Sequence, residues 1–320
     1  MPSTNTRRKI GWKKGIIRLA ILVCLAYCGI LILFVGLQRS LIYAGRPQAV
    51  PRPVNFFPAD RIEDVQVPAQ DGILLHGWRT LSPSTQEQPS KGLVILFPGN
   101  AGTRTARISM LQTFNACGWD ALICDYRGYA DNVGKPSENA LAADARSIWD
   151  FAVDQLHYPA DHIVLCGESL GGGVATRLAW ELCQKQSPPA GLILRSTFTS
   201  LVDAGKHLYP WLPVRTCLID RYPSLSRIGQ ITCPILIMHG QLDAIVPFTQ
   251  GEKLFAAAPA KSASGITKTF LALPNSSHND LGITATRETY LAQQRFLDQI
   301  QSPIQTQSPI SSPPAEASHP

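Results

Sequence analysis

Short, wholly apolar runs alternate along most of the chain with longer stretches in which apolar residues recur every three or four positions. Residues 93–97 (LVILF) form such a run, which is typical of a strand buried on both faces of a parallel sheet. The periodic stretches are typical of amphipathic helices that cover such a sheet. We expect further strands at residues 121–125, 163–166, 192–194, 235–238 and 267–273, and helices at residues 104–117, 138–156, 170–186, 249–258 and 284–300. This alternation predicts an α/β fold with a mostly parallel central sheet and helices on both of its faces.

The N-terminal part of the chain has a different pattern. Residues 19–37 (LAILVCLAYCGILILFVGL) contain no charged residue, and a helix of this length spans a hydrocarbon core of about 30 Å. We interpret this segment as a single transmembrane anchor. A cleaved signal peptide is the second interpretation, although its apolar region is usually shorter and residues 42–44 (IYA) make a poor cleavage site. A buried core helix is the third, but the segment has no polar face.

The positive charge of the chain is concentrated before this segment. The net charge is +6, and residues 1–18 carry six basic residues and no acidic one. Basic residues before a membrane span predict a cytoplasmic N-terminus, with the rest of the chain on the extracytoplasmic side. No dense basic run occurs later in the chain, so we do not expect a nucleic-acid partner.

The composition divides the chain into five segments. These are a basic segment (1–18), the anchor (19–37), a linker rich in proline and arginine (38–60), a folded domain (61–300), and a tail rich in proline, serine and glutamine that we expect to be disordered (301–320). The domain opens with a strand pair, at 63–67 and 73–81, around the turn Asp71-Gly72. An insert at about 198–229 interrupts the alternation and forms a small cap. Its apolar stretch 209–213 suits a lid over acyl chains and core packing equally well.

The cysteines predict neither a metal site nor a settled disulfide pattern. Of eight cysteines, two lie in the apolar span and four lie in or beside apolar runs, where buried free thiols are expected. Cys217 and Cys233 flank a loop-like segment, and a disulfide between them is an open alternative in an oxidising compartment. No CxxC or histidine-rich spacing is present, so we expect neither a metal nor a cofactor.

The sequence Gly167-Glu168-Ser169-Leu170-Gly171 lies between an expected strand and an expected helix. A G-x-S-x-G sequence in this setting is typical of a nucleophile elbow, a turn too tight for large side chains that presents the serine at the start of a helix. Backbone N–H groups at the helix start face the negative charge that develops during acyl transfer. Ser169 is therefore the expected nucleophile.

A serine hydroxyl is a weak nucleophile and needs a histidine base that an acid orients. In a parallel sheet such groups come from loops at the carboxyl ends of the strands. His278 lies in the polar loop 274–280 after the last expected strand, and Asp243 lies on the turn after the strand at 235–238. Less well placed are His207, His239, His319, Asp203 and Asp220. We expect Ser169, Asp243 and His278 to form a catalytic triad in that chain order.

An oxyanion hole needs two N–H donors. One is expected from the backbone of Leu170, directly after the nucleophile. The other is expected from the glycine-containing loop 97–102, where we assign the Asn100 N–H, with Ala101 as the alternative. Arg127 follows a central strand, and we expect it to hold loops together through salt bridges.

The motifs GESLGG, HGQLDAIVP, SSHND, PGNAG and DYRGY occur together in one order. In this combination the chain, from about residue 38 to 300, resembles the membrane-anchored α/β-hydrolase domain proteins, which are grouped with serine aminopeptidase-like hydrolases. Two departures stand out. Pro98 stands where the family usually has histidine, and Ala130 and Asn132 replace a glycine and a serine of the family pattern. These changes are expected to alter the acyl pocket and the oxyanion loop.

The expected function is that of a membrane-anchored serine hydrolase that cleaves carboxylic esters or thioesters through an acyl-enzyme. Its expected substrates are small, lipid or acylated molecules. One alternative is an aminopeptidase or amidase with the same triad, in which Glu168 holds the substrate amine. Another is a membrane-tethered binding protein that keeps the fold without catalysis.

Overall fold

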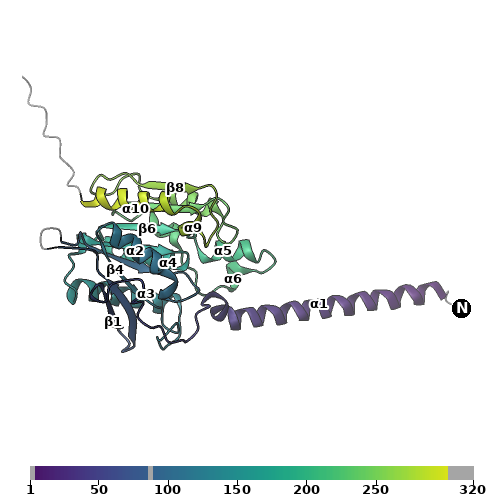
Figure 1. Ribbon diagram of the computed structural model, residues 1–320. Helices are drawn as coiled ribbons and strands as arrows, with labels where there is room; N and C mark the ends of the chain where they lie inside the picture. The colour runs from purple at the N-terminus through teal and green to yellow at the C-terminus, as the bar shows by residue number, and fades with distance from the viewer. Residues whose placement is uncertain (1–3, 86–88, 302–320) are drawn as a thin grey trace, which may run out of the picture.

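The computed structural model describes residues 4–85 and 89–301. Its centre is a sheet with strand order β1-β2-β4-β3-β5-β6-β7-β8 (Figure 1). The strands are β1 (Ile62–Pro68), β2 (Leu74–Thr80), β3 (Leu93–Phe97), β4 (Asp120–Cys124), β5 (Ile163–Glu168), β6 (Gly191–Arg195), β7 (Ile235–Gly240) and β8 (Thr269–Leu273). The expected α/β fold with a mostly parallel sheet is confirmed.

The antiparallel part of the sheet is confined to one edge. β1 pairs with β2, and β2 pairs with β4, in antiparallel fashion. The turn between β1 and β2 contains Gly72 at φ +83°, a conformation that glycine adopts without strain. β4, β3, β5, β6, β7 and β8 are parallel. Their carboxyl ends therefore lie along one edge of the sheet, where the loops that follow them meet.

Helices cover both faces. The larger core cluster lies between the sheet and the helices α3 (Glu138–Asp154), α4 (Leu170–Gln184) and α8 (Phe248–Ala257). The second cluster lies between the opposite face and the helices α2 (Ile108–Ala116) and α10 (Thr286–Gln301). A 3-10 turn (Arg104–Arg107) occupies the first residues of the helix expected at 104–117, because Arg104 and Arg107 turn inward to pair with carboxylates.

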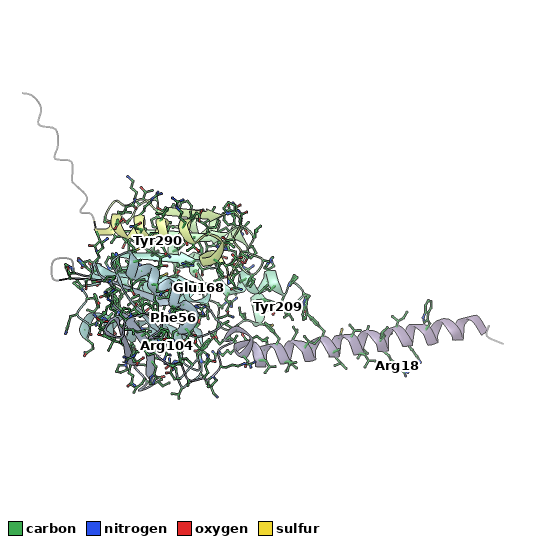
Figure 2. All side chains as sticks on the ribbon, viewed as in Figure 1. Arg18, Phe56, Arg104, Glu168, Tyr209 and Tyr290 are labelled. Carbon is green, nitrogen blue, oxygen red and sulfur yellow. The ribbon has the colours of Figure 1, made fainter. Side chains whose placement is uncertain are left out.

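The N-terminal helix α1 (Thr4–Ile42) is longer than the expected anchor (Figure 1). Within it, residues 14–42 are long and apolar enough to cross a membrane, and their most apolar 18-residue window has a mean hydropathy of 2.8 and is not buried by the rest of the chain. Figure 2 shows Arg18 on the part of α1 that projects from the domain. The expectation that a linker begins at residue 38 is wrong. Residues 38–42 remain helical because the end of α1 docks against the insert.

The insert between β6 and β7 contains α5 (Leu201–Leu208), α6 (Val214–Cys217) and α7 (Ser224–Ile228). Leu212, Val214 and Leu218 form a small apolar cluster with Phe34 and other side chains of α1. Tyr209 is 42% exposed and lies on the side of the domain from which α1 projects (Figure 2). The insert thus joins α1 to the domain.

The alternative disulfide is absent from the described part of the chain. The structure has Cys217 and Cys233 as free thiols. Cys217 lies in α6, where its carbonyl accepts a hydrogen bond from α1, whereas Cys233 is buried in the core just before β7. The expected tail lies outside the described residues, apart from Gln301, which ends α10.

Candidate active site

Ser169 occupies a tight turn between β5 and α4, with φ 50° and ψ −113°. Such a backbone is strained for a residue with a side chain, and strain of this kind concentrates at functional sites. A Cβ on Gly167 would lie 2.4 Å from the Gly171 carbonyl oxygen, and one on Gly171 would lie 2.0 Å from the Phe97 carbonyl oxygen. Only glycine at both positions lets the chain turn this sharply between the strand and the helix.

The structure brings the three expected catalytic side chains together. His278 Nε2 lies 3.0 Å from Ser169 Oγ, and His278 Nδ1 lies 2.7 Å from Asp243 Oδ2. These residues follow the ends of β5, β8 and β7, whose carboxyl ends lie along one edge of the parallel sheet. The contacts suit a serine–histidine–acid relay, in which the acid holds the imidazole with Nε2 toward the hydroxyl.

Asp243 is held as a carboxylate. Its Oδ1 accepts hydrogen bonds from the backbone N–H groups of Ile245 and Val246. Burial acts to raise the pKa of Asp243, but hydrogen bonds from His239, His278 and Val246 outweigh it and hold the pKa well below its ordinary value. Asp243 therefore stays charged through the neutral and mildly acidic range.

His239 has a contact that sequence reasoning missed. It is less well placed as a catalytic base than His278, and it is fully buried. Its Nε2 lies 2.9 Å from the Val246 carbonyl oxygen and 3.3 Å from Asp243 Oδ2. The spacing of four residues between His239 and Asp243 was visible in the sequence. This spacing alone did not predict the contact, because only the turn after β7 brings the two side chains together.

The residues assigned to the oxyanion hole lie around Ser169. Leu170 begins α4, so its N–H has no carbonyl in a preceding helical turn. Asn100 lines the same cavity. The Asn100 side-chain amide donates to the Ile42 carbonyl (3.0 Å), and the Asn100 backbone carbonyl accepts from the Ala44 N–H. These bonds tie the loop after β3 to the end of α1.

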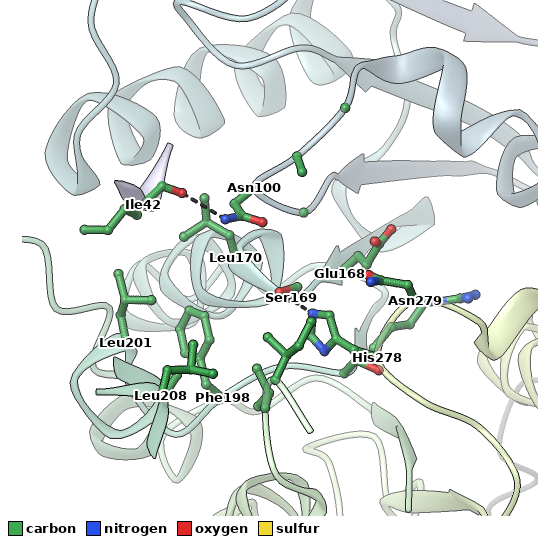
Figure 3. Close-up of a pocket in the computed structure, with 18 of the residues that line it drawn as sticks. Ile42, Asn100, Glu168, Ser169, Leu170, Phe198, Leu201, Leu208, His278 and Asn279 are labelled. Carbon is green, nitrogen blue, oxygen red and sulfur yellow. Dashed lines mark hydrogen bonds between the residues drawn. The ribbon is translucent and has the colours of Figure 1, made fainter. Parts of the chain in front are cut away.

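Ser169 and His278 open into a cavity of about 740 Å³. In Figure 3, Ile42, Leu201, Leu208 and Phe198 lie on one side of Ser169, and Glu168 and Asn279 lie on the other. The apolar wall comes from α1 and the insert, through Phe34, Leu41, Ile42, Phe198, Leu201, Leu208, Val214 and Leu218. The cavity therefore has an apolar end and a polar end, with the serine between them.

The last turns of α1 are fixed to the insert by buried polar contacts. Gln38 is 1% exposed; its Nε2 donates to the Cys217 carbonyl (3.2 Å), and its Oε1 accepts from the Ile219 N–H (2.8 Å). Arg39 forms a two-point salt bridge with Asp220 at 3.0 and 3.3 Å. Because the contacts occupy both ends of the Gln38 amide, they fix one rotation of α1 against the insert.

Glu168 is paired with an arginine. Its Oε1 and Oε2 accept hydrogen bonds from Arg107 Nη2 (3.0 Å) and Nε (3.2 Å). The Arg107 side chain is 8% exposed and the Glu168 side chain 23%. A carboxylate used in this way is a poor ligand for a substrate amine, which weakens the aminopeptidase alternative.

Two of the residues that depart from the family pattern, Ala130 and Asn132, have a role other than the expected one. Ala130 and Asn132 are buried and do not line the cavity. Ala130 pairs with the segment that follows α1, and Asn132 bridges the His76 N–H and the Asp125 carbonyl. They shape the loop after β4, so the expectation that they alter the acyl pocket is wrong. Arg127 holds loops as expected, through salt bridges to Asp144 and Asp71.

Comparison with known proteins assigns the family. The family model for serine aminopeptidase S33 matches residues 88–222. Over 86% of its length the chain is 40% identical to a Mycobacterium tuberculosis protein, Uncharacterized protein Rv2307c, of which it covers 92%. The chain belongs to this α/β-hydrolase family.

More distant relatives carry names that describe an activity. The chain is 32% identical to Lysophosphatidylserine lipase ABHD12 of Macaca fascicularis, over 60% of this chain and 51% of that protein. It therefore spans about half the length of that relative. The fold resembles that of the Pyrococcus furiosus esterase Pf2001, with a TM-score of 0.62, 17% identity, and coverage of 80% of this chain and 97% of the esterase.

Proposed function

We propose that this protein is a membrane-anchored serine hydrolase that cleaves carboxylic esters or thioesters of acylated lipids, with Ser169, His278 and Asp243 as its catalytic triad. The observation that carries the proposal is the relay of hydrogen bonds from Asp243 through His278 to Ser169 Oγ, between the apolar and the polar end of the cavity.

The first half of the proposed reaction forms an acyl-enzyme. Ser169 Oγ attacks the acyl carbon while His278 Nε2 accepts the hydroxyl proton, and Asp243 stabilises the imidazolium that results. The Leu170 N–H and the Asn100 N–H stabilise the oxyanion of the tetrahedral intermediate. When the intermediate collapses, the bond to the alcohol or thiol breaks, and His278 returns the proton to that leaving group.

The second half releases the acid. His278 deprotonates a water molecule, and the resulting hydroxide attacks the acyl carbon on Ser169. Collapse of this second intermediate restores the Ser169 hydroxyl and releases a carboxylic acid. Every proton passes through His278, so the sequence of steps requires no metal ion or further cofactor.

An acyl lipid is favoured over a peptide by the walls of the cavity. Its apolar end is built from α1 and the insert and offers many methylene contacts but few hydrogen-bond partners for a peptide backbone. Glu168, the candidate for binding a substrate amine, is occupied by Arg107. The lysophosphatidylserine lipase among the relatives fits the same substrate class.

The position of the anchor supports a substrate drawn from the membrane. Phe34, Leu41 and Ile42 belong to the apolar helix α1 and also line the cavity, so the cavity lies where the helix leaves the bilayer. The basic residues before the span favour a cytoplasmic N-terminus with the catalytic domain on the extracytoplasmic side. In sealed vesicles whose outer face is the extracytoplasmic face, this orientation leaves the domain open to added protease. Protection of the domain in such vesicles would contradict the orientation.

The catalytic proposal is tested with the full-length protein in detergent micelles. Ser169→Ala is expected to abolish hydrolysis of p-nitrophenyl butyrate and labelling by a fluorophosphonate probe. Ser264→Ala, at an exposed loop position, serves as the matched control and is expected to retain both. Undiminished ester hydrolysis by Ser169→Ala would refute the mechanism. Hydrolysis of aminoacyl-anilides without ester turnover would favour the aminopeptidase alternative instead.

A further inference from the structure

Arg195 is a buried arginine at the end of β6, and it lines the catalytic cavity. It is 8% exposed, and its Nε is a buried donor without a hydrogen-bond partner. Within residues 4–85 and 89–301, its guanidinium forms no salt bridge. A buried charge without a partner is costly, and buried arginines are normally paired. An unpaired arginine in a substrate cavity therefore points to an anionic group of the ligand.

The strand register places Arg195 close to the nucleophile. Arg195 pairs with Glu168 on the neighbouring strand β5, and paired residues of adjacent strands direct their side chains to the same face. Two residues earlier, Cys166 and Ile193 both pack in the second core cluster, so Arg195 and Glu168 lie on that face. The Ser169 N–H donates to the Arg195 carbonyl at 2.9 Å. Arg195 is thus joined directly to the backbone of the elbow.

The charges around Arg195 do not balance. Both oxygens of Glu168 already accept hydrogen bonds from Arg107, whose remaining Nη1 donates to the Ala101 carbonyl. The cluster of Arg107, Glu168 and Arg195 therefore has two guanidinium groups and one carboxylate. Even if Glu168 turned toward Arg195, one of the two arginines would lose its partner, and the excess positive charge would remain. A charge in a partly buried site attracts an anion more strongly than one in open water.

A second unpartnered donor lies next to Arg195. The Ser196 hydroxyl is buried, lines the cavity, and has no hydrogen-bond partner within the described parts of the chain. The guanidinium fork and this hydroxyl are groups that suit the oxygens of a phosphate or carboxylate. Buried donors are normally satisfied by acceptors such as backbone carbonyls. Two unsatisfied hydrogen-bond donors at this end of the cavity therefore indicate a place for a ligand.

We infer that Arg195 binds the anionic headgroup, a phosphate or a carboxylate, of a single-chain acyl lipid whose ester bond lies at Ser169. This inference rests on the proposed hydrolase function. The two ends of the cavity match the two ends of such a molecule, because the apolar residues from α1 and α5 lie on one side of Ser169, and Glu168 lies on the other (Figure 3). The acyl chain occupies the apolar end, and the headgroup reaches Arg195.

The test compares substrates that share one oleoyl ester and differ only in headgroup. These are 1-oleoylglycerol 3-phosphate, the oleoyl ester of glyceric acid, and neutral 1-oleoylglycerol. Wild-type protein is expected to prefer at least one anionic substrate by kcat/KM. In Arg195→Gln the ratio of anionic to neutral kcat/KM is expected to fall about 10- to 100-fold, the effect of losing a charge-assisted hydrogen bond. The two anionic substrates distinguish phosphate from carboxylate recognition.

Two further variants make the result specific. Arg195→Lys keeps the charge but loses the planar fork, and its ratio is expected to fall less than that of Arg195→Gln. Arg287→Gln removes an exposed arginine of α10 and is expected to leave the ratio unchanged. An inhibition experiment on the wild type does not depend on whether the variants fold. Glycerol 3-phosphate should inhibit wild-type hydrolysis of p-nitrophenyl butyrate more strongly than glycerol does.

The outcomes separate this inference from the proposed function. If the wild type hydrolyses the neutral and anionic esters equally well, or if Arg195→Gln keeps the anionic preference, the headgroup site is wrong while the hydrolase stands. Equal inhibition by glycerol 3-phosphate and glycerol, together with no preference for the glyceric acid ester, would also refute the site. If none of the esters is hydrolysed and Ser169 fails to react with the fluorophosphonate, the hydrolase function itself is wrong.

Discussion

The docking of α1 against the insert makes a quantitative prediction for Gln38. Replacement by alanine leaves the Cys217 carbonyl and the Ile219 N–H, both now bonded to the Gln38 amide, without that partner. A buried polar group without a partner costs about 1–3 kcal/mol, so Gln38→Ala should weaken the docking of α1 by about 2–6 kcal/mol. The apolar end of the cavity then loses one of its walls.

The consequence depends on the length of the acyl chain. Phe34, Leu41 and Ile42 of α1 line the cavity. If each of these side chains buries one methylene group of the substrate, at about 0.8 kcal/mol per methylene, undocking of α1 lowers kcat/KM about 60-fold. A butyryl chain ends near Ser169 and does not need this wall. We expect Gln38→Ala to lose activity toward p-nitrophenyl palmitate and to keep most of it toward p-nitrophenyl butyrate.

The assay uses full-length protein in micelles, with Ser40→Ala as the control on an exposed position of the same helix. Equal loss toward both esters would indicate general damage to the domain. Unchanged hydrolysis of p-nitrophenyl palmitate would show that α1 is only a tether. It would refute the claim that α1 forms a wall for the acyl chain.

Two other predictions concern the site itself. Asp243→Asn should lower kcat for ester hydrolysis about 10⁴-fold. Because the Asp243 pKa is lower in the folded than in the unfolded protein, the carboxylate stabilises the fold above about pH 4 and loses this effect as pH falls further. Thermal unfolding of Asp243→Asn should therefore depend less on pH between about pH 5 and 2 than that of the wild type, and an equally steep dependence would contradict this. Gly167→Ala places a methyl group 2.4 Å from a backbone oxygen and should lower the unfolding free energy by about 3 kcal/mol or more. Gly282→Ala, with no atom within 4 Å of the added carbon, should stay within about 0.5 kcal/mol of the wild type in the same denaturant titration.

Much of the fold and of the candidate site is determined locally, which is why sequence patterns are sufficient to predict it. The apolar run at 163–166, followed by the glycines around Ser169, specifies a strand, a sharp turn and a helix whatever the rest of the chain does. The order of Ser169, Asp243 and His278, each placed after an expected strand, predicts that they converge, since parallel strands bring their carboxyl ends to one edge. The structure places the three side chains in contact.

Other features depend on contacts between distant segments. The length of α1 is such a case, because apolar composition predicts a span but not that Gln38 remains helical by bonding to backbone groups about 180 residues away. The position of Ala130 and Asn132 is another, since a resemblance at the level of motifs does not say which side of a loop faces the pocket. The contact of His239 with Asp243 likewise depends on the turn after β7.

The sequence by itself determined the α/β alternation, the elbow and the order of the catalytic residues, because these depend on residue types and spacings within short segments. Only the tertiary structure decided that the anchor helix forms a wall of the catalytic cavity. It also decided that Glu168 is used by Arg107, leaving Arg195 unpaired at the polar end. Charge balance in a buried site is a property of the groups that surround it in space. The equal numbers of acidic and basic residues after residue 18 do not reveal which of them meet.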